Sequence, residues 1–408
     1  METQKTKKGP SLANQGPSKG VINMAKVNDK KNKHQRPQLN AGDQDLARIT
    51  DAAWSAIEKA NQPPRLFRYG DVPCRLEHDD REVLTVRQLN PDRLLYEVAR
   101  VAQWFRRDSK GNQNPASPPM RVIKDMLAVP NLPLPVLSRI TEVPVFAPDG
   151  TLQTESGYHP AAQIYCAPPE GFSVPKVPKN PTPEEISRAK DLIFGELLEE
   201  FPFVEEADRA HATAMLLLPY ARDLIQGPTP NHLVESPVPG SGKSLLVDVS
   251  LRPAFGQHLG FIPQANDDAE WRKRITAALK EGTGAIVIDN LTKHLDSGVV
   301  AGALTAENWS DRILGKSEMV NLPVRCIWVA TGNNPSVSTE IARRSIRIRI
   351  DPKCERPWER KDFKHPNLTV WANKHRADLV WAALTLIQAW VVAGQPLWHS
   401  KTLGSYEH

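Results

Sequence analysis

The chain has 408 residues, of which 40% are hydrophobic, so it can hold two or three domains with sizeable cores. It contains no apolar run approaching about 18 residues and no apolar stretch of a signal peptide near its start, so we expect a soluble, cytoplasmic protein without a membrane segment. Its four cysteines are far apart and form no CxxC pair, which argues against a disulfide framework and a zinc site.

The net charge of +5 is concentrated at the start of the chain. Residues 1–40 hold nine Lys or Arg against two acidic residues, a balance of +7, so the remainder carries −2. This segment is also rich in Gly, Pro and Asn, and we predict a disordered basic tail over 1–40. Such a tail can hold nucleic-acid phosphates without sequence preference. A solvated tail without a partner fits the composition as well.

Residues 41–170 are predicted to form a small α+β accessory domain. Apolar residues at helical spacing indicate helices over 43–60, 92–105 and 120–128. Short strands are expected within 66–87 and over 140–146. The composition of this domain indicates no function. The proline-rich residues that follow predict a stiff linker over 171–182.

From residue 183 onward, predicted helices and strands alternate. Helices are predicted at 183–200, 207–226, 243–249, 267–280 and 299–305, with a short one holding 342–344. Strands are predicted at 232–236, 259–262, 281–291, 325–331 and 345–350, and a hairpin at 311–320. This alternation predicts an α/β fold, a parallel sheet with helices on both faces. We assign it to 183–364, and a C-terminal helical lid, with a helix over 368–393, to 365–408.

A phosphate-binding loop is predicted where the first of these strands meets a helix. The stretch SPVPGSGKSLL supplies Pro239, Gly240, Ser241, Gly242, Lys243, Ser244 and Leu245 as the nucleotide-binding residues. The two glycines permit the backbone angles that turn N–H groups toward phosphates, and the lysine reaches the β- and γ-phosphates of ATP. The full pattern has glycine where this chain has Pro237, and an ordinary turn is the alternative interpretation.

A second set of polar residues is predicted beside this loop. The β-branched run EGTGAIVIDNL ends in Asp289, which together with Ser244 is the expected ligand pair for Mg²⁺; a core strand that happens to end in Asp is the alternative. Asn333 follows another buried strand, where its amide can orient the attacking water. Hydrolysis of a γ-phosphate needs such positioning, together with positive charge on the transferring group.

Three basic residues are candidates for contacts with other molecules. Arg343 and Arg344 lie where a ring-forming ATPase presents an arginine finger to the nucleotide of its neighbour; a surface salt bridge is the alternative. Lys316 lies at the tip of the predicted hairpin, where it can grip the backbone phosphates of single-stranded DNA. An exposed turn lysine without a partner explains the same position equally well.

Over roughly residues 42–408 the chain resembles the AAA+ class of ATPases. Within this class it resembles the predicted helicase portion of phage and integrative-element primase-helicases, which are close to superfamily-3 helicases. The motifs are SPVPGSGKSLL (236–246), AIVIDN (285–290), DRILG (311–315), ATGNN (330–334), ARRSIRIRID (342–351), ERPWERKDFKHPNL (355–368) and RADLVWAALTLIQAW (376–390). The resemblance implies a Mg²⁺-ATP-driven ring, a hexamer, that acts on DNA during replication of a mobile element. It also implies that Asn333 is the sensor-1 asparagine, that Arg343 or Arg344 is the finger, and that Arg376 is a sensor-2 arginine of the lid.

The sequence departs from this family in three places. Asn290 follows Asp289 where most such motors have a glutamate that polarises water, and an amide cannot take a proton. No primase catalytic domain precedes the ATPase, so any priming activity belongs to a separate partner. The chain also ends soon after the lid, as a fragment or a shortened member would. A replicative helicase is therefore the favoured function, with an ATP-binding switch, loader or scaffold, and a phage-defence ATPase, as alternatives.

Overall fold

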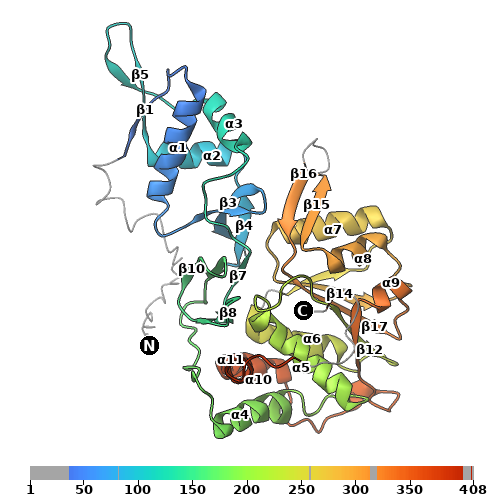
Figure 1. Ribbon diagram of the computed structural model, residues 1–408. Coiled ribbons are helices and arrows are strands. Elements are labelled where there is room, and N and C mark those ends of the chain that lie inside the picture. Colours follow the sequence, from blue (N-terminus) through green and yellow to red (C-terminus); the bar gives the residue numbers. More distant parts are fainter. Residues whose placement is uncertain (1–35, 81, 257–258, 313–318, 398–405, 407–408) are drawn as a thin grey trace, which may run out of the picture.

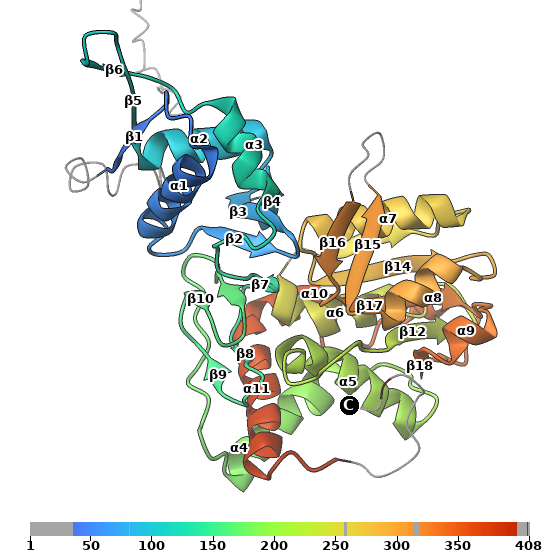
Figure 2. The same cartoon turned by 45° about the horizontal axis from the view of Figure 1, so that its top comes forward.

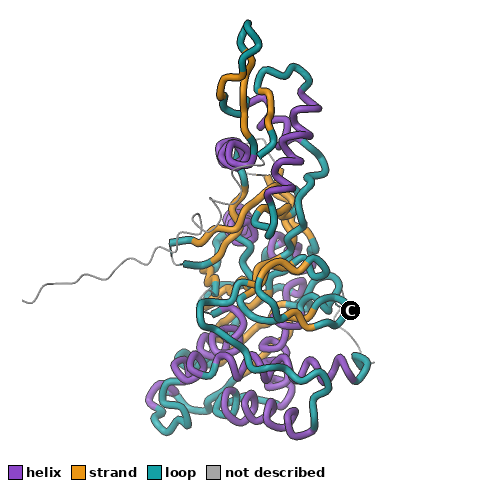
Figure 3. Tube along the Cα trace, turned by 90° about the vertical axis from the view of Figure 1, so that its left-hand side faces the viewer, coloured by secondary structure: helices purple, strands orange, loops and turns teal. Residues whose placement is uncertain are grey.

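The computed structural model describes residues 36–80, 82–256, 259–312, 319–397 and 406. The molecule is elongated (Figure 3), with the N-terminal helices at one end and a parallel sheet with its covering helices at the other (Figure 1). Within the described residues, no helix is both long and apolar enough to span a bilayer.

Three helices form the core of the N-terminal end. They are α1 (Leu46–Ala60), α2 (Pro91–Val101) and α3 (Met120–Ala128), and beside them lies a sheet of β1 (Gln38–Asn40), β5 (Gln103–Arg107) and β6 (Gln113–Pro115). Asn90 caps α2 by accepting from the Arg93 N–H at 2.8 Å. The predicted helix 92–105 is wrong beyond Val101, because residues 103–105 pair in parallel with β1. A buried Trp104 next to an exposed Gln103 fits a strand better than a helix.

Small sheets connect this end to the rest of the molecule. One contains β2 (Leu66–Tyr69), β3 (Val72–His78) and β4 (Leu84–Gln88); a second contains β7 (Arg139–Thr141), β10 (Gly157–His159) and β11 (Ile164–Cys166); a third contains β8 (Val145–Phe146) and β9 (Leu152–Gln153). The turn between β2 and β3 holds Gly70 at φ +63°, and a Cβ there would lie 1.9 Å from the carbonyl oxygen of Asn321. Glycine is therefore required both by the backbone angle and by the neighbouring chain.

The proline-rich segment between β11 and Pro183 contains neither a helix nor a strand, but it packs against the long C-terminal helix. Trp381 donates through Nε1 to the Lys176 carbonyl at 3.3 Å, and Gln388 donates to the Lys179 carbonyl at 3.0 Å. Phe172 and Val177 also contact the adjoining hydrophobic core. Figure 2 shows the segment running beside α11 (Arg376–Val392).

The next helices are shorter than predicted. Residues 183–200 form α4 (Pro183–Lys190) and then a wider π-helical turn, η1 (Asp191–Leu197), whereas α5 spans Glu206–Ala221 instead of reaching Gln226. Thr182 and Glu185 form a capping box at the start of α4. The end of α5 is fixed by tertiary contacts, because Arg222 and Asp223 enter a buried polar network.

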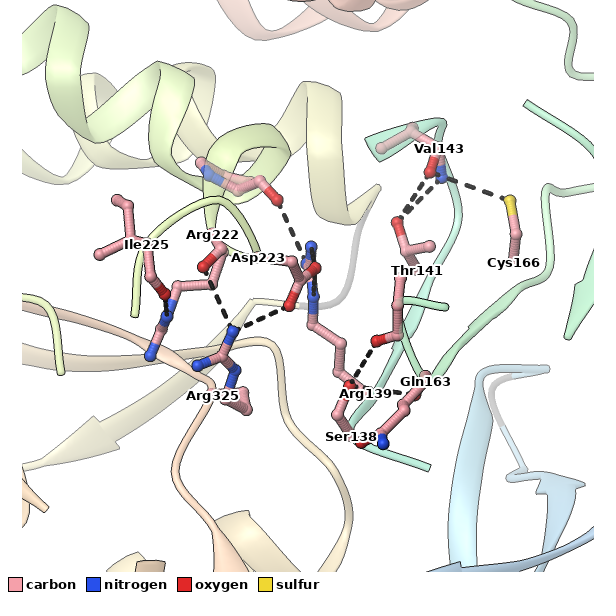
Figure 4. A network of polar contacts seen from close by, with 12 residues as sticks. Ser138, Arg139, Thr141, Val143, Gln163, Cys166, Arg222, Asp223, Ile225 and Arg325 are labelled. Atoms are coloured by element: carbon pink, nitrogen blue, oxygen red, sulfur yellow. Dashed lines mark hydrogen bonds and ion pairs between the residues drawn. The ribbon is translucent and has the colours of Figure 1, made fainter. Parts of the chain in front are cut away.

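That network joins three distant parts of the chain (Figure 4). Asp223 accepts from Arg139 of β7 through Nε at 3.0 Å and Nη2 at 2.5 Å, and from Arg325 through Nη2 at 3.0 Å. Arg222 donates to the carbonyls of Ile225 and Gly227. Burial, with Arg325 and Arg139 nearby, lowers the pKa of Arg222 to about 9. The carboxylate of Asp223 is thus shared between two arginines of different elements.

Five described strands form the parallel sheet that was predicted. Its order is β13 (Gly260–Pro263), β14 (Ala285–Leu291), β17 (Ile327–Asn333), β12 (Asn231–Ser236) and β18 (Ser345–Arg349). The connecting helices are α6 (Lys243–Phe255), α7 (Asp268–Lys280), α8 (Gly298–Thr305) and α9 (Thr339–Ala342). Successive residues of β17 point to opposite faces of the sheet and enter two different hydrophobic cores. Val329 packs in the core that contains α5 and α6, and Trp328 packs in the core that contains α7 and α8. Both faces are therefore covered, as α/β folds require.

The predicted hairpin lies between β14 and β17 in sequence. Its antiparallel strands, β15 (Asn308–Arg312) and β16 (Met319–Pro323), start earlier and end later than the predicted bounds 311–320. The predicted lid helix 368–393 consists of two helices, α10 (Leu368–Lys374) and α11, because the chain leaves helical geometry at His375. A short turn, η2 (Pro357–Glu359), precedes them.

Candidate nucleotide-binding site

The predicted phosphate loop joins the carboxyl end of β12 to the start of α6. Gly240 has φ +69° and Gly242 has φ +95°, angles that side-chain-bearing residues rarely adopt. Gly242 is the N-cap of α6, and no side chain among the described residues caps this end of the helix. The backbone N–H groups of the first turn of a 13-residue helix therefore face the loop without a side-chain acceptor. This geometry favours an anion at the loop.

Lys243 lies beneath the loop and is 8% exposed. Its Nζ donates to Asn333 Oδ1 at 2.6 Å and to Ser241 Oγ at 3.2 Å, so the acceptors in contact with it are neutral. Burial lowers the pKa of Lys243, and the nearby Asp289 carboxylate opposes this shift. A buried ammonium group held by neutral oxygens gains strongly from an anionic ligand.

Ser244 and Asp289 come together, as their predicted shared role requires. Ser244 donates through Oγ to Asp289 Oδ1 at 3.1 Å, and the same oxygen accepts from Thr331 Oγ1 at 2.7 Å. The Asn290 N–H donates to Thr331 Oγ1 at 2.8 Å and so orients that hydroxyl. A serine hydroxyl and a carboxylate are hard oxygen donors, and they fit Mg²⁺ held jointly by protein and phosphate oxygens.

The two asparagines lie at the ends of neighbouring strands. Asn333 ends β17, which pairs with β12 on one side and β14 on the other, and its side chain contacts Lys243. Asn290 lies in β14 at φ +57°, where the pairing with β17 shifts register between Ile288 and Leu291. Asparagine tolerates this left-handed angle better than most residues. The strand continues two residues past Asp289 and ends at Leu291, the last residue of the predicted strand 281–291.

The two candidate finger arginines lie far from the loop of their own chain. The sequence predicted that Arg343 and Arg344 lie within a short helix. The structure differs, because α9 ends at Ala342 and both arginines follow it. The Asn231 N–H, at the opposite end of β12 from the loop, donates to the Arg344 carbonyl at 2.9 Å. Six residues of strand span roughly 20 Å, so neither arginine reaches the loop of the same chain.

Their side chains differ in accessibility. The side chain of Arg343 is 60% exposed and lies 3.4 Å from Glu340, whereas that of Arg344 is 14% exposed, donates to the Glu340 carbonyl at 2.7 Å and pairs with the Glu340 carboxylate. Arg343 is therefore the better placed of the two to contact a neighbouring molecule.

Arg376 is not brought to the loop. It donates to the Pro253 carbonyl at 3.0 Å and to Glu142 at 2.7 Å, and its guanidinium lies over the ring of Phe172. Pro253 is ten residues after Lys243 along α6, which corresponds to about 15 Å. In this arrangement Arg376 ties the start of α11 to Glu142 and to Phe172 of the proline-rich segment.

No family model matches the chain, and no curated protein matches it either. Among solved structures, it is similar to the NrS-1 C-terminal region at 12% identity and a TM-score of 0.35, covering 76% of this chain and 66% of that one. It is similar to SCCmec type IV Cch, an active helicase, at 12% identity and a TM-score of 0.34, covering 79% and 58%.

A third similar structure is JCV helicase, at 16% identity and a TM-score of 0.25, covering 51% of this chain and 61% of that one. The chain thus spans about three fifths to two thirds of the length of these proteins. TM-scores below 0.5 assign no family, so the function is argued from the residues of this chain.

The sequence prediction missed Thr331. This hydroxyl contacts both Asp289 and the backbone of Asn290, and its signal was a polar residue within the apolar strand that ends in Asn333. The prediction also assigned no role to Trp358, whose indole lies against Gly240 of the loop. Lys316, the predicted DNA contact, lies outside the described residues.

Proposed function

We propose that the chain binds Mg²⁺-ATP at the loop between β12 and α6 and uses its hydrolysis to act on DNA. The observation that carries this proposal is the convergence of three features at the carboxyl ends of the central strands: a buried lysine, a serine and aspartate pair, and a helix N-terminus without a side-chain cap. One buried ammonium group, the N–H donors of a helix N-terminus and a serine–aspartate pair that can hold Mg²⁺ would together balance the negative charge of a polyphosphate.

Each residue has a separate task in this proposal. The N–H groups of Gly240 to Ser244 hold the phosphate oxygens, and Lys243 exchanges its contact with Asn333 for one with the β- and γ-phosphates. Asn333, once released, can orient a water molecule toward the γ-phosphate. Mg²⁺, when bound, neutralises phosphate charge, and Ser244 and Asp289 are the protein groups that would hold it.

The distance between Arg343 and the loop of the same chain supports a ring in the proposal. Arg343 is exposed near the end of β12 that lies opposite the loop. It can therefore serve a nucleotide only if a second subunit brings its own loop there. A closed ring, with six subunits as the expected number, satisfies every site in this way. Single-stranded DNA is the proposed partner, and replication of a phage or mobile element is the proposed setting.

The test is ATP turnover by the purified chain with Mg²⁺, titrated with single-stranded DNA, together with its mass by light scattering. We expect DNA-stimulated turnover by a hexamer-sized particle.

Lys243→Ala should abolish ATP binding without unfolding the protein, whereas Lys273→Ala, an equal change of charge at an exposed position on α7, should have no effect. Retained ATP affinity in Lys243→Ala would refute the site.

The arginine finger is tested in mixed rings. Arg343→Ala should remove turnover but spare ATP binding. Mixing it with Lys243→Ala subunits should restore activity, because an intact loop then meets an intact arginine on the neighbouring subunit. Failure of this complementation contradicts the role of Arg343.

Asn290 favours a second function, an ATP-binding switch with little turnover. Its amide cannot accept a proton from water. The residue is exposed in β14, with a backbone angle φ in the left-handed region. In this case, ATP binds tightly but DNA leaves the slow turnover unchanged. The same titration therefore distinguishes the switch from the motor.

A further inference from the structure

An exposed tryptophan lies directly against the phosphate loop. Trp358 belongs to the short turn η2 and is 59% exposed. A Cβ added to Gly240 would lie 2.8 Å from its Cε3 atom, so one edge of the indole rests on the backbone of the loop. The rest of this large aromatic surface faces solvent beside the place where phosphates are proposed to bind.

The turn that carries Trp358 is held firmly to the body of the protein. Pro357 is buried, and Arg360 forms an ion pair with Glu200 at 2.9 Å. The Lys364 N–H donates to the other oxygen of Glu200 at 2.7 Å, and Lys364 Nζ lies 3.2 Å from Glu196. These contacts fix the backbone on the C-terminal side of Trp358 to Glu196, near the end of η1, and to Glu200, which follows it. The indole is therefore exposed at a fixed position and not at the end of a loose loop.

A second aromatic residue flanks the loop but is not accessible. A Cβ added to Gly242 would lie 3.6 Å from Phe201, whose ring is buried and lies 6.2 Å from that of Phe203. Phe201 thus supports the loop from within. Trp358 contacts the neighbouring glycine and keeps a free aromatic surface, so it is the residue that a ligand in the loop can meet.

We propose that Trp358 stacks on the nucleobase of a nucleoside triphosphate whose phosphates occupy the loop. This inference rests on the proposed function, because it takes the loop as the phosphate site. An indole recognises the face of any base and not its hydrogen-bonding edge, so the contact strengthens binding without selecting one base. The ligand class is accordingly nucleoside triphosphates in general, with ATP as one member.

The experiment compares ATP with inorganic tripolyphosphate, both with Mg²⁺, by calorimetry on the full chain. The wild-type protein should bind ATP more tightly than tripolyphosphate. Trp358→Ala should weaken ATP binding by about tenfold, equivalent to ~1.4 kcal/mol of lost stacking, and should leave tripolyphosphate binding unchanged. Trp358→Phe should retain most of the ATP affinity, and GTP and CTP should respond to Trp358→Ala as ATP does.

A control variant separates stacking from support of the loop. Phe363→Ala removes a partly exposed aromatic residue from the same segment, where its ring lies under Arg360, and should leave both affinities unchanged. Equal weakening of ATP and tripolyphosphate by Trp358→Ala would overturn the inference, because the indole would then only shape the loop. So would unchanged ATP affinity.

Two outcomes distinguish this inference from the proposed function. If the wild-type protein binds ATP and tripolyphosphate equally tightly, the phosphate site stands and the base contact is refuted. If it binds neither ligand, the proposed function fails and the base contact fails with it.

Discussion

Neutralising Asp223 should destabilise the protein far more than neutralising an exposed acidic residue of the adjacent helix. Asp223→Asn keeps the shape of the side chain but removes the charge that faces Arg139 and Arg325. The amide has one acceptor oxygen in place of two, so at least one arginine loses its partner. Arg222 adds a third guanidinium nearby, and burial, with Arg325 and Arg139 close to it, lowers its pKa.

The magnitude follows from burial. Removing one partner of a buried ion pair costs roughly 3–5 kcal/mol, because the remaining charge stays buried and unpaired. A loss of this size lowers Tm by on the order of 10 °C in a domain of a few hundred residues. Arg139→Met should cost less, because Asp223 then keeps its bond to Arg325 at 3.0 Å.

The assay is thermal unfolding followed by calorimetry at neutral pH. Glu206→Gln is the matched control, since Glu206 pairs with Arg209 at 2.8 Å on the exposed surface of α5, where such a pair contributes about 0–1 kcal/mol. Equal Tm values for Asp223→Asn and Glu206→Gln would refute the reasoning. A larger loss in Arg139→Met than in Asp223→Asn would show that the carboxylate is not the centre of the network.

Three further predictions concern single residues. Burial, with a smaller effect of His211, lowers the pKa of His232 from 6.5 to about 4, so stability should fall by about 1.4 kcal/mol per pH unit as pH drops through this interval; His232→Leu should flatten this dependence of Tm on pH. Gly70→Ala should lower Tm by several degrees, because its Cβ would meet the Asn321 carbonyl, and an unchanged Tm would contradict the packing of β2 and β3 against β16. Thr331→Val should leave the fold intact but weaken Mg²⁺-dependent ATP binding, measured by calorimetry with and without Mg²⁺, because Asp289 loses a hydrogen bond; equal affinities would argue against this role.

The sequence predicts the parallel sheet and its loop well because their signals are local. Gly240, Gly242 and Lys243 lie within four consecutive residues, and each strand of the sheet is a short apolar run between helices. Asn333 was expected beside the loop because it follows a buried strand, and the structure brings its Oδ1 within 2.6 Å of Lys243 Nζ. The hairpin of β15 and β16 was predicted for the same reason, although its bounds were too short.

The remaining features depend on contacts that a linear pattern does not contain. Arg376 lies at the far end of α6 because Glu142 and Pro253 bind it there, and both are more than 100 residues away in sequence. The first three residues of β5 were predicted as helix because the apolar spacing of α2 continues into them, and the partner of Gln103 in β1 is Gln38, far earlier in the chain. Thr331 was missed because its hydroxyl has meaning only once β14 lies beside β17.

The accessory region and the helices on one face of the parallel sheet share a hydrophobic core, which affects how the gene can be divided. Phe67 and Val86 pack in the same cluster as Ile275 and Leu279 of α7, and the Tyr69 hydroxyl donates to the Leu279 carbonyl at 3.0 Å. A chain that starts at the proline-rich segment would leave this side of α7 bare to water. Expression of the isolated half with the parallel sheet should therefore yield an aggregation-prone product, and recombinant fragments are better started before β1, so that α1 stays packed on α2 and α3.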